Sequence, residues 1–208
     1  MPVAVLLPPA RRRSEGRLPD LDDQHDVDHR GLSERTARIL LDTYVFWPGG
    51  LVADLDPSDE IEYAAVDLGL RLITPATPSP PRRLARLILD RLPRPQITGE
   101  HEMTEWIRAR RSTLRQGGYL IIAVTRRPEP GEPYADHHSA ITAAARTAGM
   151  KYKQHIITVH RPLAEPHPNT AAEDAALSDY CHQPLTTHSD LMVFQWGTPA
   201  RGWVCRNA

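Results

Sequence analysis

The stretch Gly117-Gly118-Tyr119-Leu120-Ile121-Ile122-Ala123-Val124 decides the fold class of this chain. After the glycine pair, residues 119–124 are all apolar or aromatic, and no charge interrupts them. A short unbroken apolar run that follows turn residues is typical of a strand buried on both faces, as in the parallel sheets of α/β proteins. We therefore predict a central buried strand over residues 119–124.

Helical and strand patterns alternate on both sides of this strand. Ser33 is the predicted N-cap of the first helix, since apolar residues recur at helical spacing behind it. Alternation of helix and strand indicates an α/β domain with a mainly parallel sheet. We predict helices over residues 33–47, 57–68, 100–114 and 136–148, and further strands over residues 51–56, 70–74, 152–159 and 190–196.

One segment, residues 84–92, has two interpretations. Leu84, Leu87, Ile88 and Leu92 recur at helical spacing, which favours a helix. The place of the segment in the order of elements favours a strand over residues 87–89. Both interpretations stay open at this stage.

Composition limits the protein class. The chain has 208 residues, with 25 basic and 26 acidic side chains and a formal net charge of −1. We expect a flexible N-terminal arm over residues 1–31, which hold few large apolar side chains, and one domain over residues 32–208. Near-neutral charge disfavours nucleic-acid binding through bulk charge. No apolar run approaches the ~20 residues of a membrane span, and we expect a cytoplasmic protein with no membrane contact.

Metal ligation is not indicated by the spacing of the 10 histidines and two cysteines. His137 and His138 are adjacent, so on a helix they point about 100° apart. His155 and His160 are five residues apart, so along a strand they point to opposite faces. The remaining candidates, which lack a second closely spaced pair, are Cys181, His182 and His188. We predict no metal site.

Four segments together resemble a known family. They are Pro48-Gly49-Gly50 leading into a strand that ends Asp56-Pro57; Leu114 through Gly117-Gly118 into the central strand; the helix end Ala148-Gly149; and His188-Ser189-Asp190-Leu191-Met192-Val193-Phe194. In this order they resemble S-adenosylmethionine-dependent methyltransferases, and more narrowly the DNA amino-methyltransferases. The resemblance implies a Rossmann-like methyltransferase sheet, mostly parallel with an antiparallel final strand and with helices on both faces.

The resemblance also implies where a cofactor would bind. Asp54 and Asp56 would reach the carboxyl end of the first strand of the family's sheet, with Pro57 in the turn and Thr74 after the second strand. Family members carry a glycine-rich turn at this point, where backbone approaches the ligand closely. Here the turn has no glycine, and the second strand has no acid at its end.

The catalytic segment of the family would fall near Pro93, Arg94 and Pro95. In the family, a polar acceptor and an aromatic follow the fourth strand and hold the target base. Neither residue type is present here. We therefore predict a methyltransferase-like protein without cofactor or catalysis, which acts by binding nucleic acid or protein. The alternative is an active S-adenosylmethionine-dependent methyltransferase that acts on nucleic acid.

Candidate contacts for DNA are Arg94, Arg126 and Arg127, which follow strands at the carboxyl edge of the sheet, where ligands of α/β proteins bind. A protein partner is the second candidate. Exposed sheet edges would also permit a homodimer.

Overall fold

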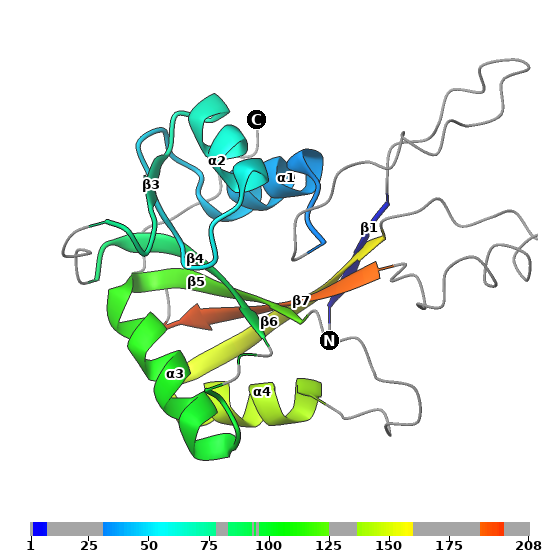
Figure 1. The fold of residues 1–208 in the computed structure, drawn as a ribbon, viewed down its shortest axis with the longest axis vertical. Coiled ribbons are helices and arrows are strands. Elements are labelled where there is room, and N and C mark those ends of the chain that lie inside the picture. The colour runs from blue at the N-terminus through cyan, green and yellow to red at the C-terminus, as the bar shows by residue number, and fades with distance from the viewer. Residues whose placement is uncertain are drawn as a thin grey trace, which may run out of the picture.

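The computed structural model describes residues 2–7, 31–77, 83–92, 94, 96–124, 137–159 and 188–197, without the side chains of His137 and His188. Figure 1 shows a central sheet with α1 and α2 on one face and α3 and α4 on the other. The strands are β1 (Val3–Leu6), β2 (Leu51–Asp54), β3 (Arg71–Ile73), β4 (Ala85–Leu92), β5 (Leu114–Val124), β6 (Met150–Val159) and β7 (His188–Trp196). The helices are α1 (Glu34–Tyr44), α2 (Asp59–Asp67), α3 (Glu100–Thr113) and α4 (His137–Thr147).

The sheet has seven strands in the order β1-β6-β7-β5-β4-β2-β3. β7 runs antiparallel to both of its neighbours, β5 and β6. All other neighbouring pairs are parallel. This arrangement confirms the predicted fold class, a mostly parallel Rossmann-like methyltransferase sheet with an antiparallel final strand and helices on both faces.

Each face of the sheet has its own hydrophobic core because strand side chains alternate between the faces. Val52 and Leu87 point to the side of α1 and α2, whereas Ala53 and Ile88 point to the side of α3 and α4. The two central strands, β4 and β5, are buried on both faces, as the apolar run at residues 119–124 predicted. The predicted cap is also confirmed, since Ser33 accepts a hydrogen bond from the backbone amide of Thr36.

The segment over residues 84–92 forms a strand, so the second of its two interpretations is confirmed. Its helical spacing is a consequence of burial on both faces, because apolar side chains then do not alternate strictly along the strand. The glycine pair also differs from expectation. α3 ends at Thr113 and β5 begins at Leu114, so Gly117 and Gly118 lie inside the strand at an irregular register with β4 instead of preceding it as turn residues.

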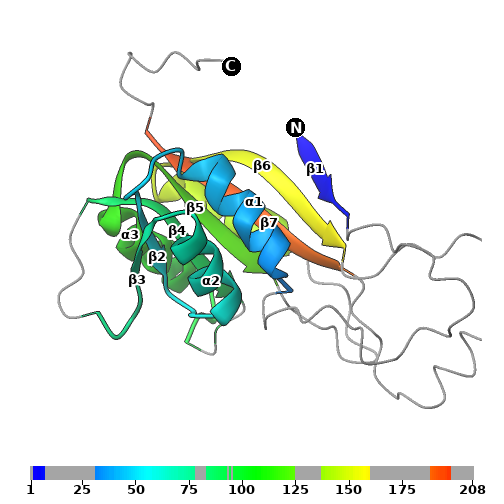
Figure 2. The same cartoon turned by 90° about the horizontal axis from the view of Figure 1, so that it is seen from above.

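The first strand lies where we expected an arm. Val3–Leu6 forms β1 and pairs in parallel with β6 at the edge of the sheet, as Figure 2 shows. Ala4 and Leu6 pack against the core on the side of α1. Part of the expected arm, residues 1–31, therefore belongs to the sheet, and its residues 8–30 lie outside the described part of the chain.

A buried polar cluster joins α1 to the sheet. The hydroxyl of Tyr44 donates to Oε1 of Gln154 on β6 at 3.0 Å. Arg86 on β4 donates to the backbone carbonyls of Tyr44 and Gly117, at 3.3 and 3.0 Å. Burial, and then the nearby Tyr119, raises the pKa of Tyr44 above its ordinary value. The neutral phenol is therefore the form that this cluster favours.

Within the described residues, none of the helices is long and apolar enough to cross a membrane.

Candidate functional site

The candidate site lies at the carboxyl ends of β2 and β4, where the sequence placed a cofactor. Asp54 ends β2 and is fully buried. Its carboxylate accepts hydrogen bonds from the backbone amides of Asp56 and Ser58, at 3.4 and 3.3 Å. Asp54 therefore stabilises the turn between β2 and α2 through these two hydrogen bonds. Ser58 is also the N-cap residue of α2.

Asp56 lies two residues further and faces β4. Asp54 pairs with Leu89 in the parallel register of β2 and β4, so the same register brings Asp56 level with Arg91. Oδ2 of Asp56 lies 2.9 Å from Nε of Arg91, and Oδ1 lies 3.7 Å from Nη2 of Arg94. The carboxylate that the resemblance implied for a cofactor site is thus paired with two guanidinium groups of the protein.

Asp90 is the centre of the same arrangement on the other face of the sheet. Its side chain is 0% exposed. Oδ1 accepts from the guanidinium of Arg94 and, at 2.8 Å, from the backbone amide of Arg91, while Oδ2 accepts from Nε of Arg110 at 2.8 Å. A buried carboxylate requires such partners, because an unpaired charge away from water is strongly destabilising.

Arg110 comes from α3 and lies over the ring of Trp106 on the same helix, with 4.3 Å between the guanidinium carbon and the ring centroid. This contact adds a cation–π attraction and fixes the direction of the guanidinium. Two carboxylates and three guanidinium groups thus form one carboxylate–guanidinium network, whose members are Asp56, Asp90, Arg91, Arg94 and Arg110.

The structure brings some of the predicted site residues together. Asp54, Asp56 and Pro57 lie in one turn, and Arg94 reaches that turn through Asp56. Thr74 follows β3, where its backbone amide donates to Oγ1 of Thr77 at 3.0 Å. The four further predicted residues, Pro93, Pro95, Arg126 and Arg127, lie outside the described part of the chain.

The residues described at this edge do not fit S-adenosylmethionine. The amide of Ser58 is already bonded to Asp54, and Pro57 has no amide hydrogen, so the turn offers few donors to a ligand. Asp56 forms ion pairs with Arg91 and Arg94. A guanidinium there repels the sulfonium and ammonium groups of the cofactor. Thr74 replaces the acid that would hold ribose hydroxyls.

Three members of the network, Asp90, Arg91 and Arg110, escaped the sequence analysis. A signal did exist for Asp90, because a carboxylate in a buried central strand must find an oppositely charged partner. The sequence does not show which partner, since Arg110 is 20 residues away on another element.

Comparisons with known proteins give likenesses of structure alone. No family model and no curated protein sequence matches the chain. An S-adenosylmethionine-dependent methyltransferase from Archaeoglobus fulgidus matches with 11% identity and a TM-score of 0.46, over 78% of this chain and 94% of the other. A 1,6-didemethyltoxoflavin-N1-methyltransferase from Burkholderia thailandensis matches with 14% identity and a TM-score of 0.48, over 79% and 78%.

A third solved structure is described as a putative DNA modification methylase from Thermus thermophilus. It matches with 15% identity and a TM-score of 0.35, over 81% of this chain and 53% of the other. Identities at this level concern the fold and carry no substrate or activity across. The order and directions of its own strands give this chain the methyltransferase fold in its Rossmann-like form.

Proposed function

We propose that this protein is a methyltransferase-like protein that does not transfer methyl groups and that acts by binding a nucleic-acid or protein partner. The observation that carries the proposal is the carboxylate–guanidinium network at the carboxyl ends of β2 and β4. It occupies, with the protein's own charges, the place that the family uses for its cofactor.

The energy needed to open the network supports this proposal. A ligand that separated Asp90 from its arginines would leave a buried charge without its partners, which costs about 3–5 kcal/mol. Since ~1.4 kcal/mol is tenfold in affinity, such a cost weakens binding by about two to four powers of ten. A cofactor that would bind at about 1 μM without this cost would then bind at about 0.1–10 mM.

The chemistry of the segment after β4 supports the same conclusion. An amino group that is methylated must give up a proton, so the site needs an acceptor within hydrogen-bond reach. Arg94 lies in the segment where we expected the family's acceptor, and a guanidinium only donates. Arg94 is moreover held by Asp90 and Asp56.

Partner binding has candidate surfaces on two edges of the sheet. Arg126 and Arg127, which follow β5 in the sequence and lie outside the described residues, are our proposed contacts for a phosphate backbone. Phe46 and Trp47 follow α1 at the opposite edge and are 59% and 52% exposed. Large exposed aromatic side chains of this kind are enriched where proteins bind one another.

Calorimetry with S-adenosylmethionine and S-adenosylhomocysteine at high micromolar concentration tests the non-catalytic part. We expect no binding heat from either compound. Saturable one-to-one binding at micromolar affinity would contradict the proposal and favour the alternative, an active methyltransferase acting on nucleic acid.

Binding of fluorescent duplex DNA over a series of salt concentrations tests the partner. If DNA is the partner, affinity falls with salt, and Arg126→Ala with Arg127→Ala weakens binding and reduces the salt slope. Arg38→Ala is the control, because Arg38 is an exposed arginine on α1 that is paired with Asp67. Absence of salt-sensitive binding excludes DNA and leaves a protein partner.

A further inference from the structure

Two strands, β6 and β7, bring a histidine and an aspartate together near the carboxyl end of β5, where Asp190 pairs with Val124. Asp190 is paired with Ile157 across the antiparallel β6–β7 ladder, and His155 is paired with Met192. Residues 155 and 157 lie on the same face of β6, so His155 and Asp190 are diagonal neighbours on one face of the sheet. This is the face that α4 covers, since Met192 packs in the same core as α4.

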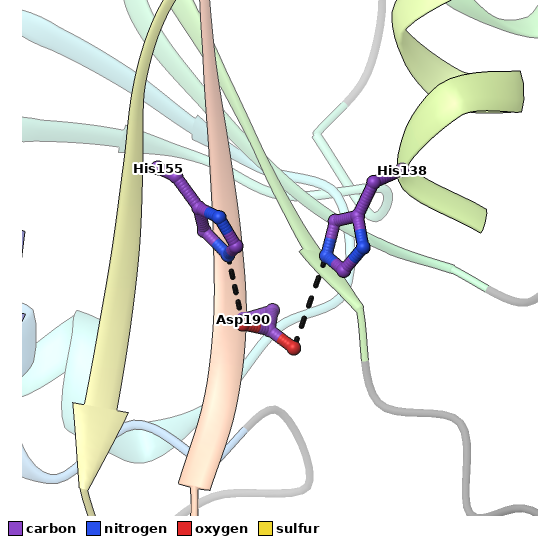
Figure 3. A group of neighbouring side chains, drawn as sticks. All are labelled: His138, His155 and Asp190. Atoms are coloured by element: carbon purple, nitrogen blue, oxygen red, sulfur yellow. Dashed lines mark hydrogen bonds and ion pairs between the residues drawn. The ribbon is translucent and has the colours of Figure 1, made fainter. Parts of the chain in front are cut away.

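A second histidine reaches the same place from α4. Ile141, Ala145 and Ala148 form the buried stripe of this segment against the sheet. His138 precedes Ile141 by three residues, so it continues that stripe at the first turn of the helix. Figure 3 shows the side chains of His138, His155 and Asp190 converging from these three elements.

The donor atoms of the three side chains lie close to one another. Nε2 of His155 is 2.8 Å from Oδ1 of Asp190, and Nε2 of His138 is 3.8 Å from Oδ2 of the same carboxylate. All three ligand atoms lie within 4.8 Å of one another. Nε2 of His138 is buried, and within the described residues it makes no hydrogen bond. Such an atom lacks a hydrogen-bonding partner that its burial requires.

We propose that His138, His155 and Asp190 bind a divalent transition-metal ion of the Zn²⁺ type. Zinc binds imidazole nitrogen at about 2.0–2.1 Å and carboxylate oxygen at about 2.0–2.2 Å, so its ligands lie about 3.3 Å apart. The two measured separations, 2.8 and 3.8 Å, lie on either side of that value. Small side-chain rotations therefore suffice to place the three donors around one ion.

The donor set also defines the kind of site. Two imidazoles and one carboxylate leave at least one coordination position for water or another ligand, as in catalytic rather than structural zinc sites. The three side chains are 20–27% exposed, so the cluster is half-buried. This site shares no residue with the carboxylate–guanidinium network, and it stands whether or not the proposed function is correct.

Titration calorimetry of the metal-free full-length chain with Zn²⁺ is the test, and Co²⁺ in place of Zn²⁺ reports ligand geometry through its visible absorption. We expect one ion per chain at this site. His138→Ala, His155→Ala and Asp190→Asn each weaken binding by at least about 100-fold, more than loss of an outer-shell partner does. The matched control is His101→Ala, which removes an exposed histidine from α3.

Circular dichroism of each variant separates loss of metal from loss of fold. Asp190→Asn keeps the shape of the side chain. If either alanine variant loses native structure, metal binding by Asp190→Asn therefore tests the site. Binding that is absent from the wild-type chain, or that is equal in Asp190→Asn and His101→Ala, overturns the proposal. In that case the three side chains form a hydrogen-bonded cluster without a metal ion, or the ion binds other residues.

Discussion

Replacing Asp90 by Asn removes one charge from the centre of the network and keeps the size of the side chain. Arg94 and Arg110 then face an amide, and their own side chains are only 20% and 21% exposed. Removing one partner of a buried ion pair costs about 3–5 kcal/mol, because the remaining charges stay buried. A chain of this length loses about 2–4 °C of melting temperature per kcal/mol, so we expect a loss of about 6–20 °C.

Urea unfolding followed by circular dichroism measures this effect on the free energy of unfolding. Arg38→Ala is the matched control, since its exposed pair with Asp67 should change stability by about 1 kcal/mol or less. A triple variant, Asp90→Leu with Arg94→Met and Arg110→Met, should regain most of the loss because apolar side chains replace a buried ion network at little cost. If Asp90→Asn stays within about 1 kcal/mol of wild type, the network does not hold in solution and the edge is open to a ligand.

Two further predictions concern parts of the fold that support the site. In Gly118→Ala the added Cβ would lie 2.8 Å from the carbonyl oxygen of Arg115 and 3.1 Å from those of Ala85 and Arg86, so overpacking should cost about 1–3 kcal/mol in thermal unfolding. An unchanged melting temperature would contradict the close approach of β4 and β5. Because the pKa of Tyr44 is raised in the fold, its contribution to stability is complete below about pH 10 and is lost as pH rises through the folded pKa. Tyr44→Phe should therefore reduce the alkaline fall in unfolding free energy between pH 8 and pH 11, and an equal fall in both proteins would refute this.

Most of the sheet could be predicted from sequence because its buried strands carry continuous apolar runs. Residues 119–124 are the clearest case, and β4 was ambiguous for the same reason, since burial on both faces hides the period of a strand. β1 could not be predicted in this way. Its residues Val3–Leu6 are short and pair with β6, about 150 positions away in sequence, so no local pattern indicates the pairing.

The candidate site could be predicted in position but not in its interactions. Asp54 and Asp56 lie at the carboxyl edge as expected, because the end of a parallel strand fixes where the next residues go. Their partners depend on the register between β2 and β4, which sets Asp56 against Arg91. The histidine cluster could not be predicted from ligands closely spaced along the chain, because His138, His155 and Asp190 meet only through the register of β6 and β7 and the phase of α4.

The measurement that tests the central claim most directly is a nuclear magnetic resonance titration of the ¹⁵N-labelled chain with S-adenosylhomocysteine. The reporters are the backbone amides of Asp56 and Ser58 and the Nε–H groups of Arg94 and Arg110. We predict that the chemical shifts of these groups stay unchanged at ligand concentrations up to the millimolar range. The reason is that the carboxylate–guanidinium network lies at the carboxyl ends of β2 and β4, where the ligand would bind. Saturable shifts confined to these groups at micromolar ligand would contradict the account.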